Sequence, residues 1–346
     1  MLALTPTPIA NSFPAEPDTH AERFPLEVQQ CLRCGHVQLR HRVTVDWVDY
    51  KYATPDANRP HLANAAQEIR VRYPHFKTAL EIGSNNGLYL EELQRVGLDA
   101  YGVDPCARVG IAEPFSQRLA ETLQPVDLIV ANNVLAHVDD LWDVFRGIDS
   151  LLKDDGALVF EVQHLPAMIE NGAFDMIYHE HRDYHTLGPW VPFLKRWGLV
   201  ITRIQYLETH GGSIRVFCER PGRALAVPYE EIDWRAFKAR IQRAKTQVQQ
   251  QVLAVDGQIA AFGATAKATT LLHHFGLTEA ITYCVDSTPA KQGRYLPGTT
   301  IPICDPAGLR EAPPAAVLLT AWNFESVIRA QYPHLHFIVP FKEHTV

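Results

Sequence analysis

The sequence predicts an α/β protein with a largely parallel sheet at its core and a second, smaller unit of similar kind after it. Short apolar segments with strand character alternate with helical segments between residues 61 and about 222. A strand, a glycine turn and a helix start again after residue 256. With 346 residues, 47% of them hydrophobic, the chain is long enough for two or more domains with substantial cores.

We expect four parts along the chain. Residues 1–60 form a small N-terminal lobe, which begins rich in proline and has little core of its own. Residues 61–222 form the main α/β core, and residues 223–256 form a linker with a long helix. Residues 257–346 form a second unit, whose strand and glycine turn make it Rossmann-like.

The main core has a readable order of elements. In chain order they are the strand TALEIGS, the helix LYLEELQRVG, the strands DAYGVD and VDLIVAN, the helix LWDVFRGIDSLLKDDG and the strand GALVFEVQH. Two further strands, LVITRIQYLE and GSIRVFCER, are joined through THGG and predict an antiparallel hairpin. A hairpin at the end of an otherwise parallel sheet is typical of the class I methyltransferase fold, which we therefore expect.

The linker and the last unit are predicted from periodicity. Apolar residues recur at three- and four-residue spacing from residue 229 to about 254, namely Trp234, Phe237, Ile241, Ala244, Val248 and Val252. This spacing predicts one long helix with a buried stripe. The segments QIAAFGATAK, ITYCVDST, PAAVLLTAWN and LHFIVPF supply the strands of the last unit.

Composition and charge narrow the class of protein. The net charge of −7 and the pI near 6.1 argue against a nucleic-acid partner, because general phosphate binders are usually basic. No apolar run is long enough to cross a bilayer, and the proline-broken N-terminus lacks the basic region of a secretory signal. The scattered cysteines are typical of reduced thiols, so we expect a cytoplasmic protein. We also expect a monomer or a weak oligomer.

A glycine loop predicts a cofactor site. The segment EIGSNNG places Glu81 before two glycines spaced G-x-x-x-G, directly after a strand. Asp104 ends the next strand, where its carboxylate can accept from both ribose hydroxyls of a bound nucleoside. The preceding acid and the spacing favour S-adenosylmethionine over NAD, whose fingerprint is G-x-G-x-x-G. The predicted cofactor residues are Glu81, Gly83, Asn85, Gly87, Asp104 and Asn132.

A cluster of proton-transfer groups predicts catalysis. The segment FDMIYHEHRDYH brings Tyr178, Glu180 and His181 together, and imidazole is well suited to move a proton near neutral pH. Two zinc ligands on one helix face need i, i+4 spacing, so His179 and His181 do not form such a pair. His137 follows the third strand, where it can face the cleft or simply cap a helix.

Two further sets of residues have weaker signals. Cys31 and Cys34 form half of a zinc site, since four ligands are needed, and His20, His36 or His41 could complete it. Lys267 follows a glycine turn and can bind a phosphate, as can Lys291 and Arg294, although all three can also be ordinary surface residues.

Seven segments together resemble the sugar C-methyltransferases that make branched deoxysugars. They are PLEVQQCLRCGHVQL, EIGSNNG, VANNVLAHV, FDMIYHEH, THGGSIRVF, FGATAKAT and DSTPAKQGRYLPG, in the family's order and over nearly the whole chain. The resemblance implies a zinc lobe, a methyltransferase core and a C-terminal Rossmann-like domain. It also implies methyl transfer from S-adenosylmethionine to C-3 of a nucleotide-diphosphate 4-keto sugar.

The resemblance assigns roles to individual residues. It makes His181 the base that forms an enolate, with Glu180 holding its ring and Tyr178 or His137 stabilising the enolate oxygen. A tyrosine ahead of the core, Tyr52 or else Tyr50, helps to enclose the site. The residues assigned to the substrate are His210, Gly211, Lys267, Lys291 and Arg294.

Two departures and two alternatives accompany the resemblance. The family's first C-x-x-C would precede LALTPTPIANSF, so retention of zinc is in question, and Asn86 stands where the family often has Asp. An NAD-dependent dehydrogenase with two Rossmann-like units stays open at this point. So does a non-catalytic module that binds a nucleotide sugar.

Overall fold

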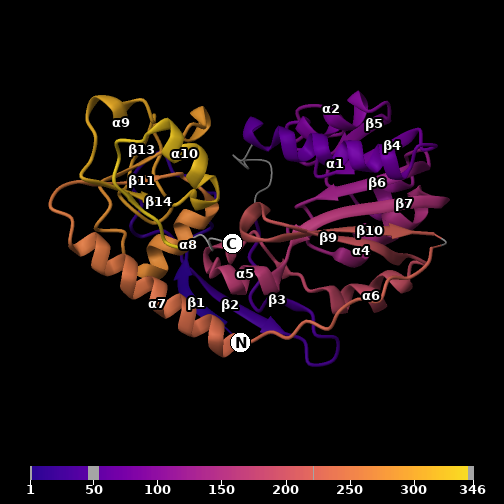
Figure 1. The fold of residues 1–346 in the computed structure, drawn as a ribbon, viewed down its shortest axis with the longest axis horizontal. Coiled ribbons are helices and arrows are strands. Elements are labelled where there is room, and N and C mark those ends of the chain that lie inside the picture. Colours follow the sequence, from indigo (N-terminus) through magenta and orange to yellow (C-terminus); the bar gives the residue numbers. More distant parts are fainter. Residues whose placement is uncertain (1, 46–53, 221, 342–346) are drawn as a thin grey trace.

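Three sheets organise the chain (Figure 1). The computed structural model describes residues 2–45, 54–220 and 222–341. Tyr50 and Tyr52, the two candidates for the enclosing tyrosine, lie outside the described residues. The predicted domain limits stay a prediction, and the sheets are described below one at a time.

The central sheet has six strands in the order β5-β4-β6-β7-β10-β9. They are β4 (Thr78–Ile82), β5 (Asp99–Val103), β6 (Val126–Asn132), β7 (Leu152–Gln163), β9 (Val200–Leu207) and β10 (Ser213–Glu219). The first four are parallel, whereas β10 runs antiparallel to both β7 and β9. The predicted strands and terminal hairpin are therefore confirmed, as is the α/β fold class.

Helices cover both faces of this sheet. They are α1 (Arg59–Arg72), α2 (Leu88–Arg95), α3 (Gln117–Ala120), α4 (Leu141–Leu151) and α6 (Leu187–Lys195), whereas α5 (Leu165–Asn171) packs with the N-terminal lobe and the C-terminal unit. Figure 1 shows α1 and α2 on one side of the strands, and α4 and α6 on the other. Apolar side chains of each helix pair join a separate buried cluster with the strands between them. The carboxyl edge of the parallel strands is thus held by packing from both sides.

One predicted helix is too long. The pattern LWDVFRGIDSLLKDDG predicted a helix through the glycine, but α4 ends at Leu151 and β7 begins with Leu152. The buried Leu152 pairs with Val126 of β6, and Lys153 Nζ lies 2.7 Å from the Asp127 carboxylate. These contacts stabilise the extended chain, so sheet pairing prevails over the local helical pattern.

The N-terminal lobe is built on a small antiparallel sheet. Its strands are β1 (Leu2–Thr7), β2 (Phe24–Gln30), β3 (Val37–Leu39) and β8 (Asp183–Tyr184). The last of these follows directly on the histidine-rich segment. Pairing of Val37 with Tyr184 therefore ties the lobe to the segment predicted to be catalytic.

The C-terminal unit is a five-stranded parallel sheet in the order β13-β12-β11-β14-β15. Its strands are β11 (Ile259–Phe262), β12 (Tyr283–Val285), β13 (Ile303–Cys304), β14 (Ala316–Leu319) and β15 (Phe337–Ile338), and its helices are α8 (Ala266–Phe275), α9 (Gly308–Glu311) and α10 (Glu325–Gln331). From β11 the chain adds β12 and β13 on one side of the sheet and then β14 and β15 on the other. This change of side leaves a crevice at the carboxyl ends of β11 and β14.

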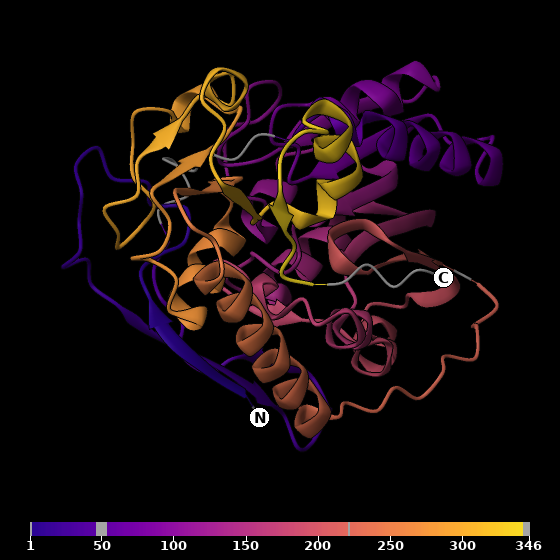
Figure 2. The same cartoon turned by 60° about the vertical axis from the view of Figure 1, so that its left-hand side comes forward.

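The linker helix α7 (Trp234–Leu253) runs beside the N-terminal strands and the C-terminal unit (Figure 2). Its buried residues Phe237, Ile241, Val248 and Val252 confirm the predicted stripe. The helix begins five residues later than predicted, because Asp233 caps it by accepting from the Ala236 N–H. Upstream, Glu230 is held by His164 at 2.6 Å and by the Leu187 N–H, which keeps the chain outside the helix.

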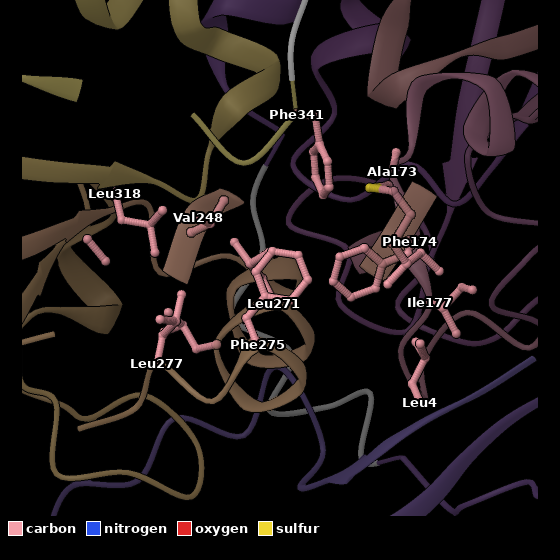
Figure 3. Close-up of a cluster of buried hydrophobic side chains, with 14 of the residues drawn as sticks. Leu4, Ala173, Phe174, Ile177, Val248, Leu271, Phe275, Leu277, Leu318 and Phe341 are labelled. Atoms are coloured by element: carbon pink, nitrogen blue, oxygen red, sulfur yellow. The ribbon is translucent and has the colours of Figure 1, made fainter. Parts of the chain in front are cut away.

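One apolar cluster joins all three units (Figure 3). It includes Leu4 of β1, Leu271 of α8 and Leu318 of β14. Phe174, from the histidine-rich segment, is fully buried and stacks on Phe275 with ring centroids 5.0 Å apart. Burial of such a side chain contributes about 1.5–3 kcal/mol. The segment that precedes the histidines is therefore anchored in the C-terminal unit.

Candidate active site

A single cavity of about 750 Å³ contains most of the predicted site residues. It lies at the carboxyl ends of β4, β5 and β6, and it continues to the carboxyl ends of β11 and β12. The predicted residues that line it are Glu81, Gly83, Asn85, Asp104, Asn132, His137, Tyr178, His181, His210, Lys267 and Lys291. A cleft of this size at such strand ends is the expected place for a nucleotide ligand.

The glycine loop after β4 lines one end of the cavity and packs tightly on Val134. Gly83 has φ +79°, and a Cβ added to it would lie 2.7 Å from the Cβ and Cγ2 atoms of Val134. Gly87, with φ +83°, precedes the first residue of α2. Asn85 also has a positive φ, of 46°. The loop therefore needs glycine at Gly83 for both its conformation and its space.

Two acids lie beside this loop. The Asp104 carboxylate accepts from the Asn85 N–H at 3.0 Å and from the Cys106 N–H at 2.7 Å, which fixes its position at the cavity wall. Glu81 is buried, and its Oε2 meets no hydrogen-bond donor among the described residues. Burial raises the pKa of Glu81 to about 8, and the Asp104 carboxylate adds to the rise.

These features fit S-adenosylmethionine. The loop packs closely against Val134 at Gly83 and lines the cavity, and Asp104 offers a fixed acceptor for hydroxyls. Glu81 offers a buried oxygen that lacks a donor, which a cationic ligand would satisfy. Asn132, the last residue of β6, adds an amide to the same wall.

The central feature of the catalytic end is the pair Tyr178 and His181. A backbone hydrogen bond from the His181 N–H to the Tyr178 carbonyl closes a turn, and the two rings stack with centroids 4.0 Å apart. His181 Nδ1 lies 2.8 Å from the Met176 carbonyl, and its Nε2 lies 2.7 Å from the Tyr178 hydroxyl. A carbonyl only accepts, so Nδ1 carries the proton and Nε2 keeps its lone pair.

A second imidazole lies next to this pair. The ring centroid of His137 is 4.7 Å from that of His181, and its Nδ1 donates to the Glu180 carbonyl at 2.8 Å. Burial lowers the pKa of His137 to about 4. Burial, together with the nearby His137, holds the pKa of His181 well below 6.5. Both rings are therefore neutral at neutral pH.

Glu180 does not hold the His181 ring, contrary to the prediction. Its Oε1 accepts from both the backbone N–H and the side-chain amide of Asn11, at 2.8 and 3.1 Å. Its Oε2 is buried without a donor among the described residues, and burial raises the pKa of the carboxyl. Within the turn, residues 178 and 181 face one another, which directs the side chain of residue 180 elsewhere. The adjacent His179 lies outside the cavity and packs on Phe24.

Lys267 dominates the far end of the cavity. Its Nζ donates to Asn323 Oδ1 and lies 4.2 Å from the centre of the Trp322 ring. Burial lowers the pKa of Lys267 to about 8, although the nearby Asp175 carboxylate opposes this shift. Burial also raises the pKa of Asp175 to about 6, and its Oδ2 accepts from Trp322 Nε1 at 2.7 Å. Asp175 and Asn323 therefore offset the charge of Lys267 only in part, which leaves Lys267 able to attract an anion.

The other residues predicted to bind substrate are more dispersed. His210, with φ 55°, lines the cavity, and burial near Lys267 lowers its pKa to about 4. Lys291 lines it as well and donates to the Ala264 carbonyl at 2.8 Å. Arg294 is not among the lining residues and donates to the Phe13 carbonyl. Gly211 also lies outside the lining, where an added Cβ would meet Trp322 at 2.8 Å.

The thiols of Cys31 and Cys34 are free and exposed in the turn between β2 and β3. Within residues 2–45, 54–220 and 222–341, no group of three or more His, Cys, Asp or Glu side chains could hold a metal ion. His36, one candidate to complete a site, instead pairs with Asp183 at 2.7 Å. The described residues therefore do not make up a four-ligand zinc site.

The structure also brings residues to the cavity that sequence reasoning missed. Asn11 reaches it from the N-terminal lobe, and Asn323 reaches it from beyond β14. His61 of α1 lines it and lies 2.9 Å from the fully buried Glu161 carboxylate. Asn11 lies in the segment PIANSF, but no feature of that segment predicts its contact with Glu180, which is 169 residues away in the sequence.

Comparison with known proteins identifies the family. The sequence profile of a methyltransferase domain matches residues 56–204, and that of a C-methyltransferase C-terminal domain matches residues 208–340. The profile of a domain described as zinc-binding matches residues 1–47. The chain is 32% identical over 383 residues to C-methyltransferase NovU of Streptomyces niveus, a match that spans 97% of this chain and 91% of that protein. The chain belongs to the C-methyltransferase family.

This C-methyltransferase is accordingly an S-adenosylmethionine-dependent enzyme. The match gives no support to a dehydrogenase or to a non-catalytic module. Among solved structures, it is similar to an O-methyltransferase family protein of Burkholderia thailandensis, with 16% identity, a TM-score of 0.37 and coverage of 48% and 57% of the two chains. It is also similar to 1,6-didemethyltoxoflavin-N1-methyltransferase of the same organism, with 14% identity, a TM-score of 0.37 and coverage of 56% and 99%. These scores are too low to support conclusions about substrate.

No helix in the described parts of this C-methyltransferase is both long and apolar enough to cross a membrane.

Proposed function

We propose that the enzyme methylates C-3 of a nucleotide-linked 4-keto deoxysugar, through an enolate formed by His181. The observation that supports this most directly is the protonation pattern of His181. Its Nδ1–H is fixed on the Met176 carbonyl, so Nε2 carries the lone pair, which accepts from the Tyr178 hydroxyl at 2.7 Å and can take a proton once that hydroxyl moves. The resemblance of the seven segments to sugar C-methyltransferases supplies the substrate class.

The first step is removal of the C-3 proton by His181 Nε2. The neighbouring 4-ketone acidifies this proton, and the electron pair of the C–H bond moves toward the ketone oxygen. Burial keeps His181 neutral, and hence able to accept a proton, at neutral pH. The negative charge that develops on the substrate favours the imidazolium and offsets the low basicity that burial causes.

Tyr178 stabilises the enolate oxygen. Its hydroxyl donates to His181 Nε2 at 2.7 Å, so it must release that atom for Nε2 to take the C-3 proton. The freed hydroxyl can then donate to the developing oxyanion. Neutral His137 cannot do so, because its Nδ1–H is committed to the Glu180 carbonyl and its Nε2 carries only a lone pair. Tyr178 is therefore the stronger candidate of the two.

The second step is methyl transfer. When bound beside the glycine loop, S-adenosylmethionine supplies an electrophilic methyl group. Asp104 would accept from the ribose hydroxyls of the cofactor, and Glu81 would face its cationic part. Both reactants then lie in one cavity, which brings the methyl group close to C-3. The C-3 carbanion bonds to the methyl carbon, and the carbon–sulfur bond breaks onto sulfur. The proton taken by His181 then passes to solvent.

The nucleotide diphosphate is assigned to the far end of the cavity. Lys267 and Lys291 place two ammonium groups there, at the carboxyl edge of the C-terminal sheet. Lys267 lies in the first turn of α8, where backbone N–H groups also favour an anion. The diphosphate would then lie at the Lys267 end of the cavity and the reacting carbon at the His181 end.

Proton exchange tests this proposal separately from methyl transfer. The wild-type enzyme should exchange the C-3 proton of a nucleoside-diphosphate 4-keto-6-deoxyhexose with deuterated water, because exchange needs only the base. The His181→Asn variant should lose exchange and lose methyl transfer by about 10²–10⁴-fold. His179→Asn is the matched control, since that ring lies outside the cavity. Near-normal turnover in His181→Asn would show that another group is the base.

A further inference from the structure

A loop of the N-terminal lobe crosses the active site. It joins β1 to β2 and includes the segment from Pro8 to Pro14. At one end Asn11 donates two hydrogen bonds to Glu180, beside the catalytic turn. At the other end the carbonyls of Phe13 and Pro14 accept from Arg294 and from the Tyr295 N–H of the C-terminal unit. The loop thus joins the turn around Glu180 to the C-terminal unit.

The hydrogen bonds of Asn11 determine how its amide is oriented. The backbone N–H of Asn11 can only donate, so Glu180 Oε1 acts as an acceptor. The side-chain atom that lies 3.1 Å from the same oxygen is then the nitrogen, Nδ2. The amide oxygen, Oδ1, must point away from Glu180.

Asn11 is also part of the cavity wall. Asn11 is 8% exposed, and it lines the same cavity as Tyr178 and His181. Its Oδ1 receives no hydrogen bond from any residue in the described parts of the chain. Because Oδ1 is not among the buried side-chain atoms that lack a partner, it keeps accessible surface at the cavity and can accept from a ligand. Glu180 does not line the cavity, so of these two residues it is Asn11 that can contact a ligand there.

We propose that Asn11 binds the sugar of the substrate, an inference that rests on the function proposed above. Its Oδ1 accepts a hydrogen bond from a hydroxyl or amino group of the sugar ring. Glu180 serves as the fixed acceptor that holds the amide in this orientation. The N-terminal lobe therefore supplies a specificity-determining residue.

The first test separates sugar binding from cofactor binding. The Asn11→Ala variant removes Oδ1, so its KM for a nucleoside-diphosphate 4-keto-6-deoxyhexose should rise about 5- to 10-fold, as expected for one lost hydrogen bond. The Kd for S-adenosylmethionine should not change. Ser12→Ala is the matched control, because Ser12 is exposed in the same segment. A KM within twofold of wild type in folded Asn11→Ala would overturn the proposal, as would a loss confined to kcat.

A second variant decides the matter if Asn11→Ala does not fold. Asn11→Ser keeps a hydroxyl donor on the side of Glu180, but it carries no oxygen at the position of Oδ1, so the sugar KM should rise as in Asn11→Ala. A KM within twofold of wild type in folded Asn11→Ser would overturn the proposal.

Failure of the underlying function would look different. In that case the wild-type enzyme would neither exchange the C-3 proton of any such sugar nor methylate it, whichever base its nucleotide carries. Wild-type turnover with an unaffected Asn11→Ala variant would instead refute only the role of Asn11.

Discussion

Burial lowers the pKa of Lys267 to about 8 and raises that of Glu81 to about 8, so both groups lose a proton in the same pH range, with opposite effects on the binding of their ligands. Lys267 loses its positive charge over this range, although the nearby Asp175 carboxylate opposes the shift in its pKa. If its ammonium group holds the diphosphate, the Kd of a nucleoside-diphosphate sugar should increase several-fold between pH 7 and pH 9.

Glu81 should produce the reverse trend for the cofactor. It is neutral below its pKa and gains a negative charge above it. Its attraction for the cationic S-adenosylmethionine should therefore grow from pH 7 to pH 9, while the affinity for the sugar nucleotide declines. Calorimetry with each ligand alone at pH 7, 8 and 9 measures both trends on one protein preparation.

Variants assign each trend to its residue. Lys267→Met should bind the sugar nucleotide about 10- to 100-fold more weakly at pH 7, because a charge-assisted hydrogen bond is lost, and its Kd should depend less on pH than that of wild type, since Lys291 remains to titrate. Lys195→Met removes the same charge from an exposed site and should match wild type. Glu81→Gln should remove the pH trend for S-adenosylmethionine. A wild-type Kd for the sugar nucleotide that is constant between pH 7 and pH 9 would refute the role of Lys267.

Three further predictions concern the cofactor loop and the lobe. Asp104→Ala should weaken S-adenosylmethionine binding by roughly 1–3 kcal/mol in calorimetry, and unchanged affinity would remove this carboxylate from the site. Gly83→Ala should lower the free energy of unfolding by about 1–3 kcal/mol, because φ is +79° and Val134 blocks the new Cβ; an unaltered denaturant midpoint would contradict this. Elemental analysis should find less than one zinc per chain, and a full equivalent that is lost in Cys34→Ser would show that other ligands complete the site.

Sequence periodicity was sufficient to predict the strands of the central sheet, because burial leaves a direct record in the chain, but it did not predict the sheet of the N-terminal lobe or strand β13. The alternation of apolar strands and amphipathic helices gave the four parallel strands and the hairpin of the central sheet. It was less reliable at element ends. Leu152 belongs to both a helical pattern and a strand, and only its pairing with Val126 decides between them. That pairing joins segments 26 residues apart, so local propensity cannot express it.

The catalytic segment shows a different limit of sequence reasoning. Tyr178 and His181 could be recognised as chemically useful, and the structure brings them together because a tight turn closes between them. The same turn directs Glu180 away from its sequence neighbour and toward Asn11. Adjacency in the sequence suggested that Glu180 holds the His181 ring, but the direction of each side chain depends on the backbone turn. That turn was not predictable from the residue types.

The turn from Tyr178 to His181 is held by contacts with the N-terminal lobe, the central sheet and the C-terminal unit. Phe174 anchors the turn to α8 through its stack on Phe275, β8 anchors it to the lobe through Tyr184, and His137 joins it to the end of β6. With His181 as the proposed base, a change in any of these contacts would move that base relative to both ligands. Because positioning contributes a large part of such a rate enhancement, packing residues far from the cavity should affect kcat as well as stability. Under the proposed function, the N-terminal lobe is thus a structural part of the methyl-transfer site.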